Sequence, residues 1–94
     1  MVKVSRCKKT MKDYIKRIEV PDLIPAYAKA SNTDDDPPNR LFCYLVKSGH
    51  LYLQAEYDSD PTWEYNPWHI SYLQLSLAQM IRVVKPFQHL LAFI

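Results

Sequence analysis

The chain has 94 residues, 48% of them hydrophobic and 23% charged, with a formal net charge of +2. This balance is typical of one small globular domain and excludes an intrinsically disordered chain. A single glycine, Gly49, excludes the Gly-rich loops that cradle phosphates in nucleotide-binding proteins. No window approaches the ~20 apolar residues of a membrane-spanning helix, and no apolar segment follows the basic N-terminus as in a secretory signal. We therefore expect a cytoplasmic protein.

Charge is segregated along the sequence. Residues 1–20 carry seven Lys or Arg against two acidic residues, whereas residues 21–65 carry eight Asp or Glu against three basic residues. Residues 66–94 contain Arg82 and Lys85 and no acidic residue. This segregation favours electrostatic steering of a charged partner.

Helical patterns dominate the first 30 residues. Thr10 and Asp13 match a capping box, which predicts a first short helix that ends before Pro21. Its apolar residues share one helical face: Met11, Tyr14, Ile15 and Ile18. Asp22 is the expected N-cap of a second short helix, with Pro25 in its first turn.

Residues 40–57 alternate in the manner of a β-hairpin. We expect Ser48 and Gly49 to form a two-residue turn, because Gly49 adopts a positive φ without steric cost. That turn fixes the register of the face that covers the core, which pairs Val46 with Leu51, Tyr44 with Leu53 and Phe42 with Ala55. A third strand is expected at residues 62–65 or 2–4, because an isolated hairpin is only marginally stable.

The most apolar stretch, residues 66–85, is predicted to be one long helix with two apolar faces. Asn66 and Pro67 suit its N-cap and first turn, and Pro86 stops it. One stripe is assigned to the core: Ile70, Leu73, Leu77, Met80, Ile81 and Val84. The opposite stripe consists of Trp68, Tyr72, Leu75 and Val83. A short C-terminal helix presents a last apolar stripe: Phe87, Leu90, Leu91 and Ile94.

Together these elements predict an α+β fold in a single domain over residues 1–94. Two short N-terminal helices precede an antiparallel hairpin or three-stranded meander. The long helix packs on the sheet, and a short C-terminal helix follows. So small a domain has little core in which to bury both stripes of residues 66–85, so the second stripe is either core or interface.

No constellation of reactive side chains points to an enzyme, so no catalytic residue is predicted. The cysteines and histidines lack the close spacing that metal ligands show in a sequence. These residues are Cys7, Cys43, His50, His69 and His89. Asp58, Asp60 and Glu64 resemble the start of a calcium loop but lack its central glycine. We therefore expect no metal and no cofactor, and two reduced thiols.

The leading functional hypothesis is a non-enzymatic protein-binding module. It would act as an adaptor, inhibitor or immunity-type regulator, and its partner is another protein or a second copy in a homodimer. Since Trp and Tyr most often anchor interfaces, the anchor is assigned to the second stripe: Trp68, Tyr72, Leu75 and Val83. The residues that would steer a basic partner are Asp34, Asp35, Asp36, Asp58 and Asp60.

The alternative is a nucleic-acid-binding protein that uses its basic N-terminal arm and first helix. The cations that would contact phosphate are Lys3, Arg6, Lys8, Lys9, Lys12, Lys16 and Arg17. Tyrosines of the hairpin are candidates for stacking on bases, but the acidic middle of the chain would repel phosphate.

Overall fold

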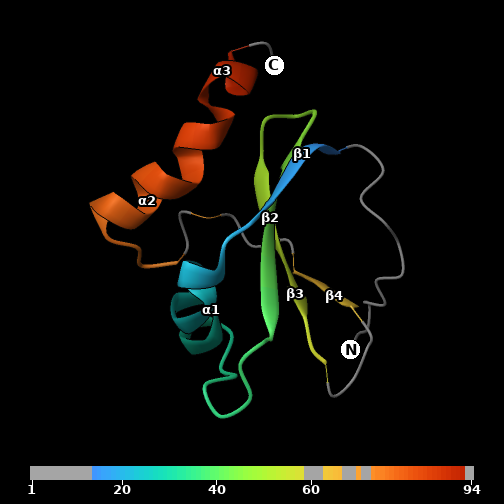
Figure 1. Cartoon of the computed structure of the whole chain (residues 1–94), viewed down its shortest axis with the longest axis vertical. Helices are drawn as coiled ribbons and strands as arrows, with labels where there is room; N and C mark the ends of the chain where they lie inside the picture. The colour runs from blue at the N-terminus through green and yellow to red at the C-terminus, as the bar shows by residue number, and fades with distance from the viewer. Residues whose placement is uncertain (1–13, 59–62, 67–69, 71–72, 93–94) are drawn as a thin grey trace.

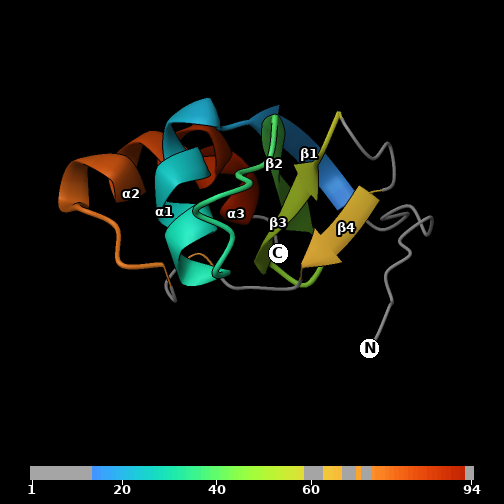
Figure 2. The same ribbon diagram turned by 90° about the horizontal axis from the view of Figure 1, so that it is seen from below.

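The computed structural model describes residues 14–58, 63–66 (backbone only), 70 and 73–92. It confirms the α+β class. A four-stranded antiparallel sheet has the strand order β1-β2-β3-β4, and all three α-helices lie on the same side of it in two perpendicular views (Figures 1 and 2).

The strands are β1 (Tyr14–Glu19), β2 (Arg40–Val46), β3 (Leu51–Glu56) and β4 (Trp63–Asn66). The helical segments are the 3-10 turn η2 (Pro21–Leu23), α1 (Ile24–Ala30), α2 (Leu77–Val84), the 3-10 turn η4 (Lys85–Phe87) and α3 (Gln88–Leu91). No helix within the described ranges is long and apolar enough to cross a bilayer.

The first predicted helix is wrong over residues 14–19, which form strand β1. Arg17 pairs with Tyr44 and Ile18 with Cys43 on β2. Side chains alternate accordingly: Ile18 packs against the core, whereas Arg17 lies over a ring on the opposite face. Pairing with β2 satisfies backbone groups that would otherwise form an open sheet edge, and this outweighs the weak helical preference of a short segment. The predicted cap at Thr10 lies outside the described residues.

The segment predicted as the second helix forms η2 and α1. Asp22 lies in the first turn of η2, and Pro25 is in the first turn of α1, where its missing N–H is harmless. Tyr27 and Ala28 carry the buried face of α1. Asn32 follows the helix end with φ 65°, a left-handed conformation that Asn tolerates.

The hairpin forms, but its predicted register is wrong by one residue. The loop spans three residues, closed by the Gly49 N–H donating to the Val46 carbonyl at 2.9 Å and the Val46 N–H donating to the His50 carbonyl at 3.1 Å. Gly49 has the expected positive φ, 90°. The observed pairs are Leu45 with Leu51, Cys43 with Leu53 and Leu41 with Ala55. Because side chains alternate between faces, the extra loop residue moves Phe42, Tyr44 and Val46 to the face away from the helices.

The third strand predicted at residues 62–65 is confirmed as β4, which pairs antiparallel with β3. The other candidate, residues 2–4, lies outside the described residues. With β1 the meander reaches four strands.

The long helix predicted over residues 66–85 is wrong. Asn66 ends β4 opposite Leu53, residues 74–76 are irregular, and α2 begins at Leu77. The helix starts there because of a capping box. The Ser76 hydroxyl accepts from the Gln79 N–H at 3.2 Å, and the Gln79 side chain accepts from the Ser76 N–H at 3.0 Å.

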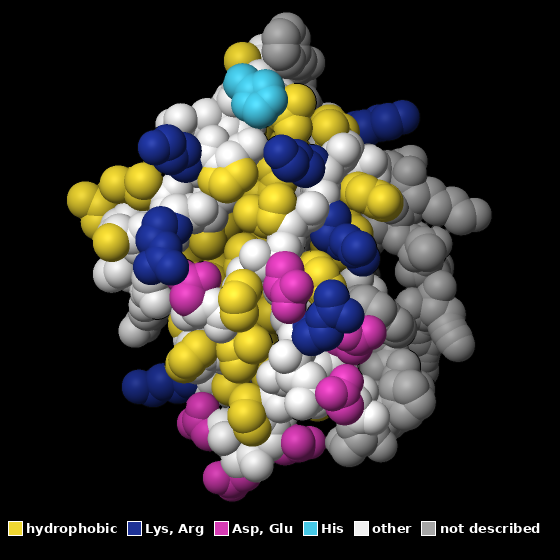
Figure 3. Space-filling model, viewed as in Figure 1, with side chains coloured by type: hydrophobic (Ala, Val, Ile, Leu, Met, Phe, Trp, Pro, Cys, Tyr) yellow, Lys and Arg dark blue, Asp and Glu magenta, His cyan; other side chains and the backbone are white. Residues whose placement is uncertain are grey.

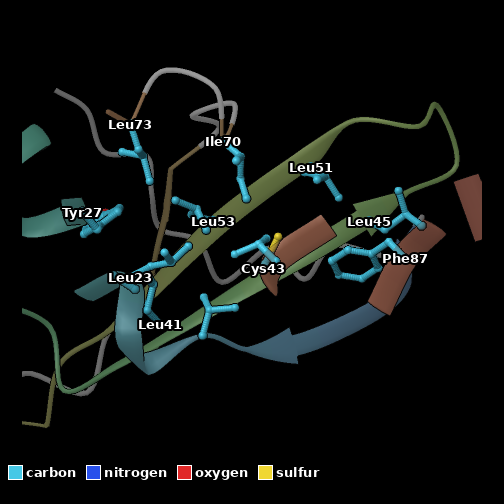
Figure 4. Packing of buried hydrophobic residues seen from close by; sticks show 13 residues of the cluster. Leu23, Tyr27, Leu41, Cys43, Leu45, Leu51, Leu53, Ile70, Leu73 and Phe87 are labelled. Carbon is cyan, nitrogen blue, oxygen red and sulfur yellow. The ribbon is translucent and has the colours of Figure 1, made fainter. Parts of the chain in front are cut away.

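The core lies between the sheet and the helical segments (Figure 4). Its fully buried members from the sheet are Leu41, Cys43, Leu45, Leu53 and Ala55. Phe87 of η4 is also fully buried and lies beside Leu45, and Leu90 and Leu91 pack partly against the same cluster. The C-terminal apolar stripe therefore docks on this domain; its last member, Ile94, lies outside the described residues.

Candidate functional site

The most exposed large hydrophobic side chains among the described residues lie on α2. Leu77 is 77% exposed and Ile81 is 53% exposed. Being four residues apart, they occupy neighbouring turns of the same helical face. The prediction that both residues belong to the core is therefore wrong. We call the helical face that contains these two residues the α2 stripe. It comprises Leu77, Met80, Ile81, Val84, Lys85 and Gln88.

An open groove of about 470 Å³ follows this stripe, lined by Met80, Ile81, Val84, Lys85 and Gln88. This spacing repeats once per turn, so the groove continues from α2 through η4 into α3. Met80 and Val84 form its floor, since both pack partly against the core. In Figure 3, hydrophobic side chains on the α2 side of the molecule are flanked by Lys and Arg side chains.

The orientation of α2 follows from two contacts on its other faces. Val83 is 1% exposed and inserts into the core, as does Phe87 one turn later. Arg82 Nη2 lies 3.0 Å from Asp22 Oδ2 and forms an ion pair with it. This carboxylate oxygen is buried from solvent and has no hydrogen bond among the described residues. Together these contacts tie α2 to the core and to η2, and leave Leu77 and Ile81 facing outward.

The predicted anchor residues do not form one surface. Val83 is core, so its assignment to an exposed stripe is wrong: a helix that starts at Leu77 and packs through Phe87 turns Val83 inward. Leu75 precedes α2 and packs partly against the core. Trp68 and Tyr72 lie outside the described residues. A Ser-x-x-Gln capping pattern at residues 76–79 was the sequence signal that marked the correct helix start.

The acidic residues lie apart from the α2 stripe. Asp34, Asp35 and Asp36 are exposed in the loop between α1 and β2. Asp58, also exposed, lies beside that loop, because its N–H donates to Asn39 Oδ1 at 2.7 Å. Acidic side chains gather at the lower end of the face in Figure 3, where Figure 1 places this loop. Asp60 lies outside the described residues.

Of the proposed phosphate-binding cations, Lys16 and Arg17 lie on β1, a strand and not a helix. The others lie outside the described residues: Lys3, Arg6, Lys8, Lys9 and Lys12. Arg17 and Arg40 stand over the Phe42 ring at 4.6 and 4.9 Å from its centroid. Phe42 is 4% exposed, so this ring is unavailable for stacking on a base.

Tyr44, the neighbouring aromatic residue, is buried as well. The Tyr44 hydroxyl donates a hydrogen bond to Gln54 Oε1. The Tyr14 ring packs edge-on against the Tyr44 ring, with 5.2 Å between the ring centroids. Arg40 is held by Glu19 at 3.5 Å and Glu56 at 3.3 Å. These contacts give the outer sheet face a structural role.

The thiol and the potential metal ligands of the described residues are the remaining candidates for chemistry. Cys43 is a free thiol, and burial raises its pKa to about 12, which suppresses the nucleophilic thiolate. Within residues 14–58, 70 and 73–92, no group of three or more His, Cys, Asp or Glu is arranged to hold a metal ion.

No protein-family model, curated protein or solved structure matches this chain.

Proposed function

We propose that this chain is a non-enzymatic protein-binding module that anchors its partner on the α2 stripe. Support comes from one observation: Leu77 and Ile81 project from adjacent turns beside an apolar groove, at 77% and 53% exposure. Fully burying a Leu or Ile side chain is worth about 1.5–3 kcal/mol, so two such residues favour association. Few anchors carry most of the energy of an interface.

The acidic loop supplies the second part of the proposal. Asp34, Asp35, Asp36 and Asp58 are exposed, and Figures 1 and 3 place their loop at the lower end of the molecule, apart from α2. These residues would accelerate encounter with a partner that carries basic residues at the matching distance, and would add less to the lifetime of the complex. An adaptor, inhibitor or regulator suits such a surface. We assign the chain to the cytoplasm, where a free thiol such as Cys43 stays reduced.

A photo-crosslinking amino acid at position 77 tests the proposal in cells that express the chain. We expect a discrete protein adduct that disappears when Ile81→Ser is added. The matched control carries the photo-crosslinker at position 47, in the exposed hairpin loop. Thermal unfolding of the Ile81→Ser chain checks that the fold is intact.

Two results would overturn this function: identical adducts from positions 77 and 47, or no adduct from either. Sedimentation velocity of the purified chain identifies the case in which the partner is a second copy.

A further inference from the structure

We propose that the segment bound on the α2 stripe is an amphipathic helix of another protein that carries carboxylates beside its apolar face. This inference rests on the proposed function and specifies its partner. Groove-lining residues recur once per turn from Met80 to Gln88. A groove with this repeat matches a ligand whose own anchors recur at i, i+3 or i+4, and i+7, which is the pattern of a bound helix.

Charge at the groove selects carboxylates. Lys85 is exposed and lines the groove, and no described carboxylate forms an ion pair with it. Arg82, the other cation of this segment, is already paired with Asp22. Residues 66–94 contain no Asp or Glu side chain that could pair with Lys85. A partner carboxylate one turn from the anchor that covers Ile81 would supply that charge.

A second copy fits the groove poorly. In a two-fold dimer centred on α2, each stripe would face an identical stripe that lacks acidic residues, so Lys85 would remain unpaired. An anionic membrane is also a poor match, because interfacial helices carry several cations on their polar face and α2 has one unpaired lysine at its end.

The test uses the full chain and three fluorescein-labelled 15-residue helical peptides. All three share one leucine stripe, and their flanking positions are glutamate, glutamine or lysine. Fluorescence anisotropy measures each dissociation constant at low and high salt. We expect the glutamate peptide to bind at least about tenfold more tightly than the lysine peptide, and to lose this advantage as salt rises.

Variants assign the preference to one residue. Lys85→Gln should abolish the advantage of the glutamate peptide, and Lys85→Glu should reverse it. Lys47→Gln, an exposed lysine of the hairpin loop, should leave it unchanged. Ile81→Ser should weaken the binding of all three peptides by a similar factor.

The failures of this inference and of the proposed function are distinguishable. Equal binding of the three peptides, all lost in Ile81→Ser, overturns the carboxylate inference and leaves the α2 stripe as a protein-binding site. Absence of peptide binding, with a position-77 adduct still formed in cells, also overturns only the inference. If the chain dimerises and Ile81→Ser abolishes the dimer, the groove binds a second copy and the inference is overturned. If the chain binds phosphatidylserine vesicles through Ile81 and does not bind the peptides, the groove binds a membrane and the inference is also overturned.

Discussion

Ile81 and Val83 are two residues apart and occupy opposite environments, at 53% and 1% exposure. Both are β-branched and apolar, so hydropathy does not distinguish them. Two residues on an α-helix are separated by about 200°, and one must face solvent when the other faces the core. Which of the two is buried depends on how α2 docks: Val83 and Phe87 pack into the core, and Arg82 forms an ion pair with Asp22 of η2.

Cys43 gives a prediction at the same scale. Burial raises its pKa to about 12, above the ~8.5 of a free cysteine. A thiol with a raised folded-state pKa contributes stability that is complete below about pH 8.5 and is lost as the pH rises toward 12. In a Cys7→Ser chain at pH 8, we expect Cys43 to react with a thiol reagent only after denaturant unfolds the protein. Labelling of the folded chain at the rate of a free cysteine would contradict this.

At the scale of elements, the segment from Asn66 to Gln79 contains two competing helix starts. Asn66–Pro67 suits an N-cap, but Asn66 is held in β4 opposite Leu53. Ser76 and Gln79 cap α2 with two reciprocal hydrogen bonds. One cap is worth about 1 kcal/mol, and sheet pairing together with the second capping box outweighs the first cap.

Replacing Ser76 with Ala should therefore destabilise the protein by about 1 kcal/mol, because the Gln79 N–H loses its acceptor. Urea unfolding measures the effect. Ser76→Asp keeps a capping oxygen and serves as the control, so it should unfold close to wild type. An equal loss of stability in both variants would show that the Ser76 hydroxyl does not stabilise the protein by capping α2.

The hairpin shows how one residue changes an entire face. A three-residue loop in place of a two-residue turn exchanges the sets Leu41, Cys43, Leu45 and Phe42, Tyr44, Val46 between the two faces of β2. Both sets are apolar and both are buried, so the alternation of β2 carries little information about its register.

At the scale of the whole molecule, the C-terminal segment closes the core and carries the exposed stripe at the same time. Phe87 seals the cluster beside Leu45, while Leu77 and Ile81 face outward from the helix that precedes it. The acidic loop lies at the lower end of the molecule in Figures 1 and 3, below α2. Apolar anchor and acidic surface are therefore separate, and a partner that uses both must span the distance between them.

This arrangement predicts opposite outcomes for two large-to-small changes. Phe87→Ala should cost about 3–5 kcal/mol, because it leaves a cavity in the core. Leu77→Ser should change stability by no more than about 0.5 kcal/mol, because Leu77 is 77% exposed. Urea unfolding of both variants measures the difference. Comparable destabilisation by Leu77→Ser would show that this side chain is packed and would remove the basis of the proposed interface.

Local sequence patterns were sufficient for the α+β class, the two hairpin strands, the positive φ at Gly49 and the apolar C-terminal stripe, and they left the third strand open between residues 62–65 and 2–4. These features follow from local alternation, proline and glycine placement, and hydrophobic spacing. Contacts between distant parts of the chain determine that residues 14–19 pair with β2, that the hairpin register shifts by one residue, and that α2 starts at Leu77. The physical reason is that caps and propensities differ by about 1 kcal/mol between alternatives, whereas strand pairing and burial of Phe87 contribute more and act between residues distant in sequence. The exposure of Leu77 and Ile81 is a product of that long-range competition.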